Sequence, residues 1–153
     1  MRNNLFIISI IFLFPCFSFS QVATEGSEEK KIQKVIQTAY IDGLQNLGDM
    51  KKVHEGFHPG FNLLGVRNNM LTKFPIYTWA QMAETRKKEN PEGVPEEEKV
   101  TCKFPMIDIT GNAAVAKLKF MKGGKHVFTD YLSLYKFDEG WRIVSKIYHE
   151  HKH

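Results

Sequence analysis

The chain has 153 residues and a small excess of basic side chains, with 21 Lys and Arg against 17 Asp and Glu. Its lysines are scattered between acids, and no basic stripe carries interleaved aromatic residues, so nucleic acid is not an expected partner. The length suits one domain with a single hydrophobic core, and 2 cysteines do not make a disulfide framework.

The N-terminus is typical of an export signal. A basic start precedes an apolar run over 5–14, and Ser18-Phe19-Ser20 places small residues at the third and first positions before Gln21. The sequence therefore predicts a signal peptide over 1–20 and one domain over 21–153. We expect a periplasmic or secreted protein with no stable membrane anchor after cleavage.

The two cysteines are separated by that cleavage. Cys16 would become a lipidated N-terminus in a lipoprotein, but Leu13-Phe14-Pro15 lacks the small residue that such a signal needs before its cysteine. Cys102 then remains alone in an apolar strand pattern, so no internal disulfide can form. We expect Cys102 to behave as a buried small hydrophobe, with a reactive thiol as the alternative.

Helical periodicity dominates the first half of the mature chain. Apolar residues over 27–47 recur at three-and-four spacing, which predicts one long amphipathic helix. Asp49 can cap a second, short helix that stops before His58-Pro59. Thr78-Trp79-Ala80-Gln81 has the form of a capping box, so a third helix is expected to begin near Trp79 and to end near Glu89.

Strand patterns dominate the second half. Apolar runs over 61–66 and 70–72 flank a turn and predict a small hairpin before the third helix. After a polar connector over 89–99 come strands over 100–109 and 113–121, and Pro105 indicates a bulge or an edge in the first of them. A closing hairpin over 128–149 turns at Asp138-Glu139-Gly140. Helices followed by an antiparallel sheet indicate an α+β domain with helices on one sheet face.

Three strands also carry a resemblance. They read AVAKL at Ala114–Leu118, TDYLSL at Thr129–Leu134 and WRIVSKIY at Trp141–Tyr148. These three segments resemble the sequences of the putative lumazine-binding family of the nuclear transport factor 2-like (SnoaL-like) superfamily. The resemblance implies an α+β cone in which three N-terminal helices pack on a curved antiparallel sheet around a central pocket. It implies a fold more firmly than an activity, because the superfamily hosts both enzymes and binding proteins.

Several side chains come from elements that enclose the pocket in that superfamily. Aromatic walls with a few polar tips suit a flat heterocycle, which stacks on the rings and accepts or donates hydrogen bonds at its edge. For each aromatic residue, ordinary core packing is the competing interpretation. The candidate ligand-binding residues are Tyr40, His58, Trp79, Asp130, Tyr131 and Tyr148.

Asp130 is an acid among apolar neighbours, between Phe128 and Leu132 on one strand face. If that face is concave, the carboxyl is desolvated and suited to proton transfer near neutral pH. Alternatively, Asp130 pairs with Lys146 across the hairpin. The turn leaves the register open by one residue, and a slip of one residue exchanges the two faces.

Three functions remain open at this stage. The leading hypothesis is a noncatalytic protein that binds a small apolar or aromatic molecule, pteridine-like if the family name is followed. An isomerase or dehydratase of the ketosteroid isomerase type would use Asp130 or His58 as the base and Tyr40 as the hydrogen-bond donor. A homodimer or another protein-interaction module would use the outer sheet face, with Tyr135 and Phe137 beside Tyr131.

The motifs of several enzyme classes are missing. There is no glycine-rich phosphate loop, nucleophile elbow or histidine-glutamate zinc helix, which disfavours triphosphate, serine-hydrolase and zinc-protease chemistry. His149, His151 and His153 alternate at the C-terminus, but no acidic or cysteine ligand accompanies them at fixed spacing. We interpret them as a solvated tail and expect neither a metal nor a cofactor.

Overall fold

The computed structural model describes residues 21–152, and their side chains from Gly26 onward. Helix α1 (Gln21–Val35) continues into η1 (Ile36–Gln45), which has π-helical hydrogen bonding. The short α2 (Met50–Gly56) and α3 (Ile76–Glu89) complete the three predicted helices, and a single 3₁₀ turn, η2 (Glu96–Glu98), precedes the sheet. The predicted signal peptide over 1–20 lies outside the described residues.

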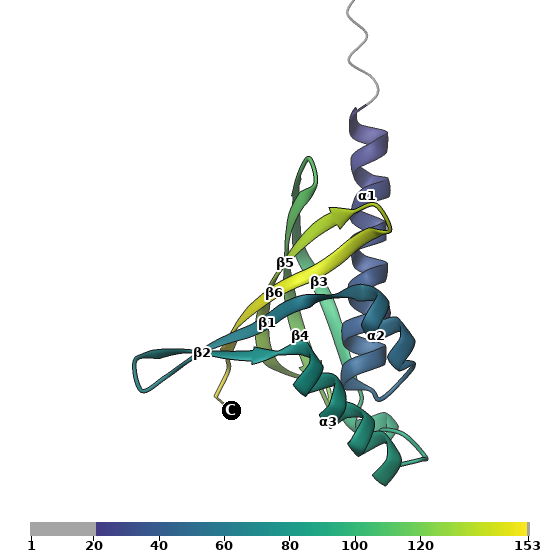
Figure 1. Ribbon diagram of the computed structural model, residues 1–153, viewed down its shortest axis with the longest axis vertical. Helices are drawn as coiled ribbons and strands as arrows, with labels where there is room; N and C mark the ends of the chain where they lie inside the picture. The colour runs from purple at the N-terminus through teal and green to yellow at the C-terminus, as the bar shows by residue number, and fades with distance from the viewer. Residues whose placement is uncertain (1–20, 153) are drawn as a thin grey trace, which may run out of the picture.

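Six strands form one sheet in the order β2-β1-β6-β5-β4-β3. The strands are β1 (Phe57–Arg67), β2 (Met70–Pro75), β3 (Val100–Thr110), β4 (Ala113–Lys122), β5 (Lys125–Phe137) and β6 (Gly140–Glu150). The sheet is strongly curved, and the α1–η1 helix lies across its concave side (Figure 1). The predicted α+β cone is therefore confirmed.

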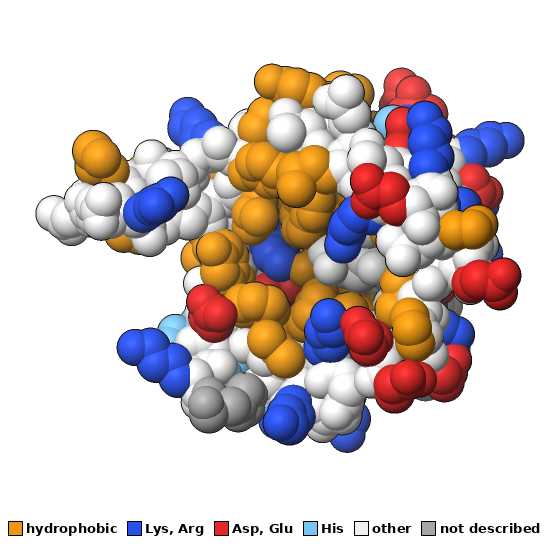
Figure 2. Space-filling view, turned by 90° about the horizontal axis from the view of Figure 1, so that it is seen from below, with side chains coloured by type: hydrophobic (Ala, Val, Ile, Leu, Met, Phe, Trp, Pro, Cys, Tyr) orange, Lys and Arg blue, Asp and Glu red, His pale blue; other side chains and the backbone are white. Residues whose placement is uncertain are grey.

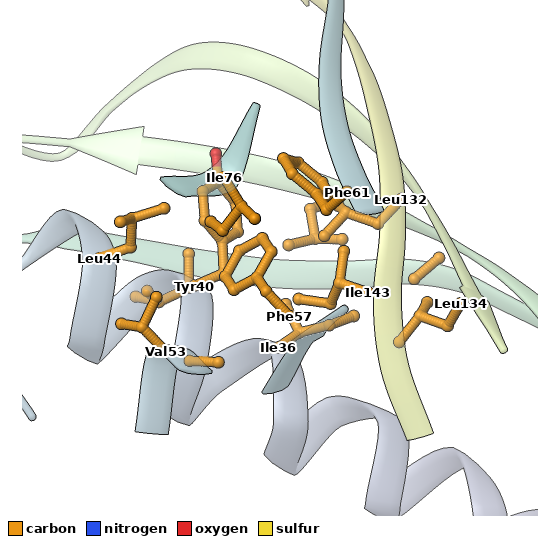
Figure 3. Close-up of a cluster of buried hydrophobic side chains, with 14 of the residues drawn as sticks. Ile36, Tyr40, Leu44, Val53, Phe57, Phe61, Ile76, Leu132, Leu134 and Ile143 are labelled. Atoms are coloured by element: carbon orange, nitrogen blue, oxygen red, sulfur yellow. The ribbon is translucent and has the colours of Figure 1, made fainter. Parts of the chain in front are cut away.

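The core fills the space between this helix and the sheet. Ile36, Tyr40 and Leu44 recur at every fourth position of η1 and are all buried, as the wider turn of a π-helix allows. They meet Phe57, Phe61 and inward-facing residues of β5 and β6 (Figure 3). Dispersion contacts and apolar burial at this one interface hold the helices to the sheet.

Glycine permits one close approach in this layer. Gly56, the last residue of α2, lies against η1, where the methyl group of an alanine in its place would come within 2.3 Å of the Ala39 Cβ atom. Glycine is therefore required for α2 to pack at this depth, and α2 in turn fixes the point at which β1 enters the sheet.

Two local predictions need correction and two are confirmed. The third helix begins at Ile76 instead of near Trp79, because Pro75 ends β2 with an extended backbone and serves as the N-cap. The sheet also contains one parallel pair, β1 with β6, which the antiparallel prediction missed. The Asp49 side chain does accept the Lys51 N–H at 2.9 Å, and β3 is an edge strand with an irregularity after Lys103, where Pro105 lies.

None of the helices within residues 21–152 combines the length and the apolar character needed to cross a bilayer.

Candidate ligand-binding site

A pocket opens between the helical layer and the lower part of the sheet. Its volume is about 230 Å³. Figure 2 shows the hollow on this face, with hydrophobic side chains around it and charged side chains at its bottom. The lining residues come from η1, β1, α3 and three strands: Tyr40, Gln45, Leu63, Trp79, Phe120, Phe128, Lys146, Tyr148 and Glu150.

A β-bulge in β6 directs Lys146 into this pocket. Ser145 pairs with Ser133 of β5, whereas Ile143 pairs with Leu134, so Val144 is an extra residue with no partner on β5. Trp141 and Ile143 are buried before the bulge. Beyond it the alternation reverses, so that Lys146 and Tyr148 point inward and Ile147 is 53% exposed. Without this extra residue, Lys146 would lie on the outer face.

Lys146 meets Asp130 and Tyr40 at the bottom of the pocket. The Lys146 ammonium is 2.9 Å from Asp130 Oδ2, and the side chains of the two residues are 6% and 0% exposed. The Tyr40 hydroxyl donates to the same Oδ2 atom at 2.8 Å, and Lys146 Nζ also donates to the Tyr40 oxygen. The other carboxylate oxygen, Oδ1, is buried and makes no hydrogen bond within the described part of the chain.

Burial controls the proton equilibria of this cluster. It lowers the pKa of Lys146 from its ordinary value, and the nearby Asp130 opposes that effect without cancelling it. Burial, with Asp130 next, raises the pKa of Tyr40 well above its ordinary value, so its phenol stays protonated. One cation against one anion makes the bottom of the pocket electrically neutral.

Aromatic rings surround the Lys146 amine. Its Nζ atom lies 4.7 Å from the ring centre of Tyr40, 5.6 Å from that of Trp79 and 5.4 Å from that of Tyr148. The Phe120 ring centre is 5.8 Å away. Tyr40 and Trp79 themselves contact edge to face at 5.8 Å. The result is an apolar wall with a single amine and a phenol hydroxyl as its polar groups near the bottom.

The structure brings together some of the predicted site residues. Tyr40, Trp79 and Tyr148 line the pocket, as the expectation of one aromatic cavity requires. Asp130 lies directly beneath it, in the pairing with Lys146 that was the alternative interpretation of this acid. A carboxyl in that position touches Lys146 and Tyr40, and does not itself form part of the pocket lining.

Two other predicted residues lie elsewhere. His58 stacks on Phe137 with ring centres 5.0 Å apart, and its Nδ1 accepts the Gly60 N–H at 3.0 Å. Tyr131 faces away from the pocket, with Lys117 5.5 Å from its ring centre. Tyr131 does not line the cavity because odd positions of β5 point outward. His58 does not line it because it lies at the start of β1, away from Leu63, the β1 residue that faces the pocket.

Sequence reasoning named Lys146 only as a partner of Asp130 and missed it as a pocket residue. Phe120 and Phe128, which also line the cavity, were missed as well. One signal was present: Asp130 is the single acid within β5, and Lys146 is the single lysine of β6, the strand that pairs with it. That signal could identify a buried pair, but not which face of the sheet holds it.

A larger groove lies at the other end of the helical layer. It has a volume of about 500 Å³ and runs between α1, α2 and the β5–β6 turn. Its rim carries exposed lysines and acids, several of which pair with one another, as Lys52 does with Glu55 at 2.7 Å. Exposed ion pairs of this kind contribute little free energy, because water screens their charges. The smaller pocket, with its buried charged groups, is therefore the better candidate for a specific site.

The remaining polar candidates do not assemble into a site. Burial raises the pKa of the Cys102 thiol to about 12, in agreement with an unreactive, half-buried cysteine. His151 lies in a tilted contact with His126, with ring centres 4.2 Å apart, so this part of the C-terminus is ordered. Within the described residues, no group of three or more His, Cys, Asp or Glu side chains is arranged to hold a metal.

Solved structures with this fold include several nuclear transport factor 2-like (NTF2-like) proteins of unknown function. One from Shewanella baltica is 29% identical, with a TM-score of 0.64 over 84% of this chain and 97% of that chain. Another, from Silicibacter pomeroyi, has a TM-score of 0.65 at 17% identity, over 83% of this chain and 98% of the other. The second likeness shows the fold alone.

Sequence comparisons give one enzyme and one family. The aldolase FrzH of Cladobotryum sp. is 29% identical over 120 residues, which are 76% of this chain and 89% of that protein. The family model described as "Putative lumazine-binding" matches residues 27–149, which include all of the pocket-lining residues except Glu150. This chain therefore belongs to the putative lumazine-binding family, within the nuclear transport factor 2-like superfamily.

Proposed function

We propose that this protein binds a small, flat, largely apolar molecule in the Lys146 pocket, with a neutral oxygen of that molecule accepting a hydrogen bond from Lys146. The observation that carries the proposal is a buried amine at the bottom of an aromatic-walled cavity. The family and its fold support ligand binding in general terms.

The charges of the site support a neutral ligand. Asp130 already balances Lys146, and Glu150 adds a further negative charge to the lining. An anionic ligand would therefore meet no unbalanced cation and would lose its hydration on entry. A ring carbonyl or another neutral acceptor can instead receive an N–H from Lys146 without displacing Asp130.

The volume supports a compact ligand. About 230 Å³ is below the roughly 300–1,000 Å³ of pockets that enclose drug-sized molecules. A neighbouring cavity of about 310 Å³ shares Gln45, Phe120 and Phe128 with this one. A one- or two-ring molecule would fill the first cavity, and a longer substituent would extend past Phe128 into the second.

Tryptophan fluorescence tests the proposal directly. In a Trp141→Phe background, Trp79 is the sole indole of the mature chain, and it lies in the pocket wall. Titration with lumazine, riboflavin, a steroid and a fatty acid should reveal a ligand that quenches this fluorescence. A ligand at a hundred times its Kd should also add about 2.7 kcal/mol to the free energy of unfolding.

Matched lysine variants make the test specific. Lys146→Met should weaken binding, whereas Lys119→Met, on the exposed side of β4, should leave it unchanged. A ligand that binds both variants equally would contradict the assignment of this pocket.

A catalytic role is the second candidate. It is favoured by the contacts of Lys146 with Asp130 and Tyr40, and by the likeness to the aldolase FrzH. A ketosteroid-isomerase-like mechanism with Asp130 as the base has weaker support, because Asp130 lies beneath Lys146 and outside the pocket lining. Turnover of a carbonyl compound that is lost in Lys146→Met and kept in Lys119→Met would favour the enzyme.

Export and dimerisation complete the proposal. The N-terminal sequence supports cleavage before Gln21, which N-terminal sequencing of protein recovered outside the cytoplasm should show. A recovered chain that begins at Met1 would contradict it. Tyr135 and Phe137 are 48% and 36% exposed on β5, which supports a sheet-face dimer. A monomer by light scattering at high concentration would exclude that dimer.

A further inference from the structure

Lys146 differs from the other lysines of the described chain in its surroundings. It is the one lysine among residues 26–152 that is buried, yet it lines an open pocket. The Lys146 amine is within reach of a bound molecule and shielded from bulk water by four aromatic rings.

The neighbours of this amine can hold and return its proton. Asp130 Oδ2, at 2.9 Å, can take a proton from the ammonium and leave a neutral amine beside a neutral carboxyl. Burial lowers the pKa of Lys146, which favours the neutral amine that this transfer leaves. Tyr40 contacts both Asp130 and the pocket, so its hydroxyl connects the carboxyl to a bound molecule.

We propose that Lys146 is a nucleophile that forms an imine with a flat, neutral aldehyde or ketone bound in this pocket. The inference deepens the proposed function and rests on it, since it names carbonyl compounds as the ligand class of the same site. Desolvated lysines act in this way elsewhere in protein chemistry, because an amine without its proton has a lone pair to donate.

The atoms of the step balance without any further reagent. The Nζ lone pair forms a bond to the carbonyl carbon, while the carbonyl π electrons move to oxygen, which takes a proton from the Tyr40 hydroxyl. Asp130 returns a proton to Tyr40. The resulting carbinolamine carries two protons on nitrogen. One of them returns to Asp130, and the other leaves with the hydroxyl group as water, so that one amine and one carbonyl give one imine and one water.

Reductive trapping tests the proposal. The mature chain is incubated at pH 7 with benzaldehyde and sodium cyanoborohydride, which converts an imine into a stable benzyl amine. Peptide mapping by mass spectrometry should find the benzyl group on Lys146 several times faster than on Lys119, since burial lowers the pKa of Lys146 and so raises the fraction of its amine that is neutral. Labelling of Lys146 at the rate of Lys119 or below would overturn the proposal.

Two variants separate chemistry from binding and from folding. Lys146→Arg keeps a cation beside Asp130, so it should fold and bind benzyl alcohol, read from Trp79 fluorescence, but give no product at this position. Tyr40→Phe, which lacks the hydroxyl that passes the proton to the carbonyl oxygen, should label Lys146 several times more slowly. If benzyl alcohol binds while benzaldehyde does not label Lys146, the imine is wrong and the binding proposal stands; if neither ligand is held, the pocket assignment fails as well.

Discussion

Removing one member of the Lys146–Asp130 pair should destabilise the protein far more than removing an exposed charge. The two charged atoms are 2.9 Å apart, and the side chains are 6% and 0% exposed. Solvent-exposed pairs contribute about 0–1 kcal/mol. Breaking a pair as buried as this one costs about 3–5 kcal/mol, because the remaining charge loses its partner without regaining water.

A double-mutant cycle isolates that effect. Asp130→Asn and Lys146→Met should each lower the free energy of unfolding by about 3–5 kcal/mol. The double variant should be no less stable than either single variant, because neither buried charge is then left alone. Urea denaturation followed by circular dichroism gives these values, with Lys119→Met, expected within about 0.5 kcal/mol of the natural chain, as the surface control.

The pH dependence of Asp130→Asn gives a second readout. Without the carboxylate that raises its pKa, Lys146 should titrate still further below its ordinary value of 10.5 in the folded state. The unfolded chain then binds more protons over that interval, so stability is lost as the pH falls from 10.5 through the folded pKa.

One result of the double-mutant cycle would refute the buried pair. In that result, Asp130→Asn and Lys146→Met each lower the free energy of unfolding by less than about 1 kcal/mol, and their effects add in the double variant.

Two further predictions concern the helical layer. Hydrogen bonds from Lys31, Trp141 and Lys136 hold the pKa of Glu28 at about 2, below its usual 4.5. The stability that Glu28 contributes is therefore present above pH 4.5 and lost as the pH falls toward 2. The melting temperature of the natural chain should fall relative to that of Glu28→Gln in that interval, and melting temperatures that change in parallel would contradict the contact. Gly56→Ala should lower the free energy of unfolding by about 1–3 kcal/mol, since the new methyl group would lie 2.3 Å from the Ala39 Cβ atom. Gly26→Ala, with open space around it, should not lower the free energy of unfolding. Equal effects of the two variants in urea denaturation would refute the tight packing.

Much of the fold could be predicted because its signals are local. The three-and-four spacing over 27–47 follows from the pitch of a helix, and the long helix observed there runs from Gln21 to Gln45. The turn at Asp138-Glu139 joins β5 to β6 as expected, with Phe137 opposite Gly140. Tyr40 and Trp79 were placed in one cavity through the family resemblance, and both line it.

The rest depends on contacts between segments that are distant in the sequence. The parallel pairing of β1 with β6 joins strands from opposite ends of the domain, and no pattern within either strand encodes its partner. His58 was expected near the pocket, but the course of β1 takes it to Phe137 instead.

The sequence by itself determined the elements of this protein, because helix and strand periodicity are written in neighbouring residues. The tertiary structure alone decided the site. The unpaired Val144 reverses the alternation of β6, so Lys146 enters the pocket above Asp130 and Ile147 faces solvent. A bulge is set by how two strands must curve around the helical core, and that requirement is a property of the folded sheet as a whole.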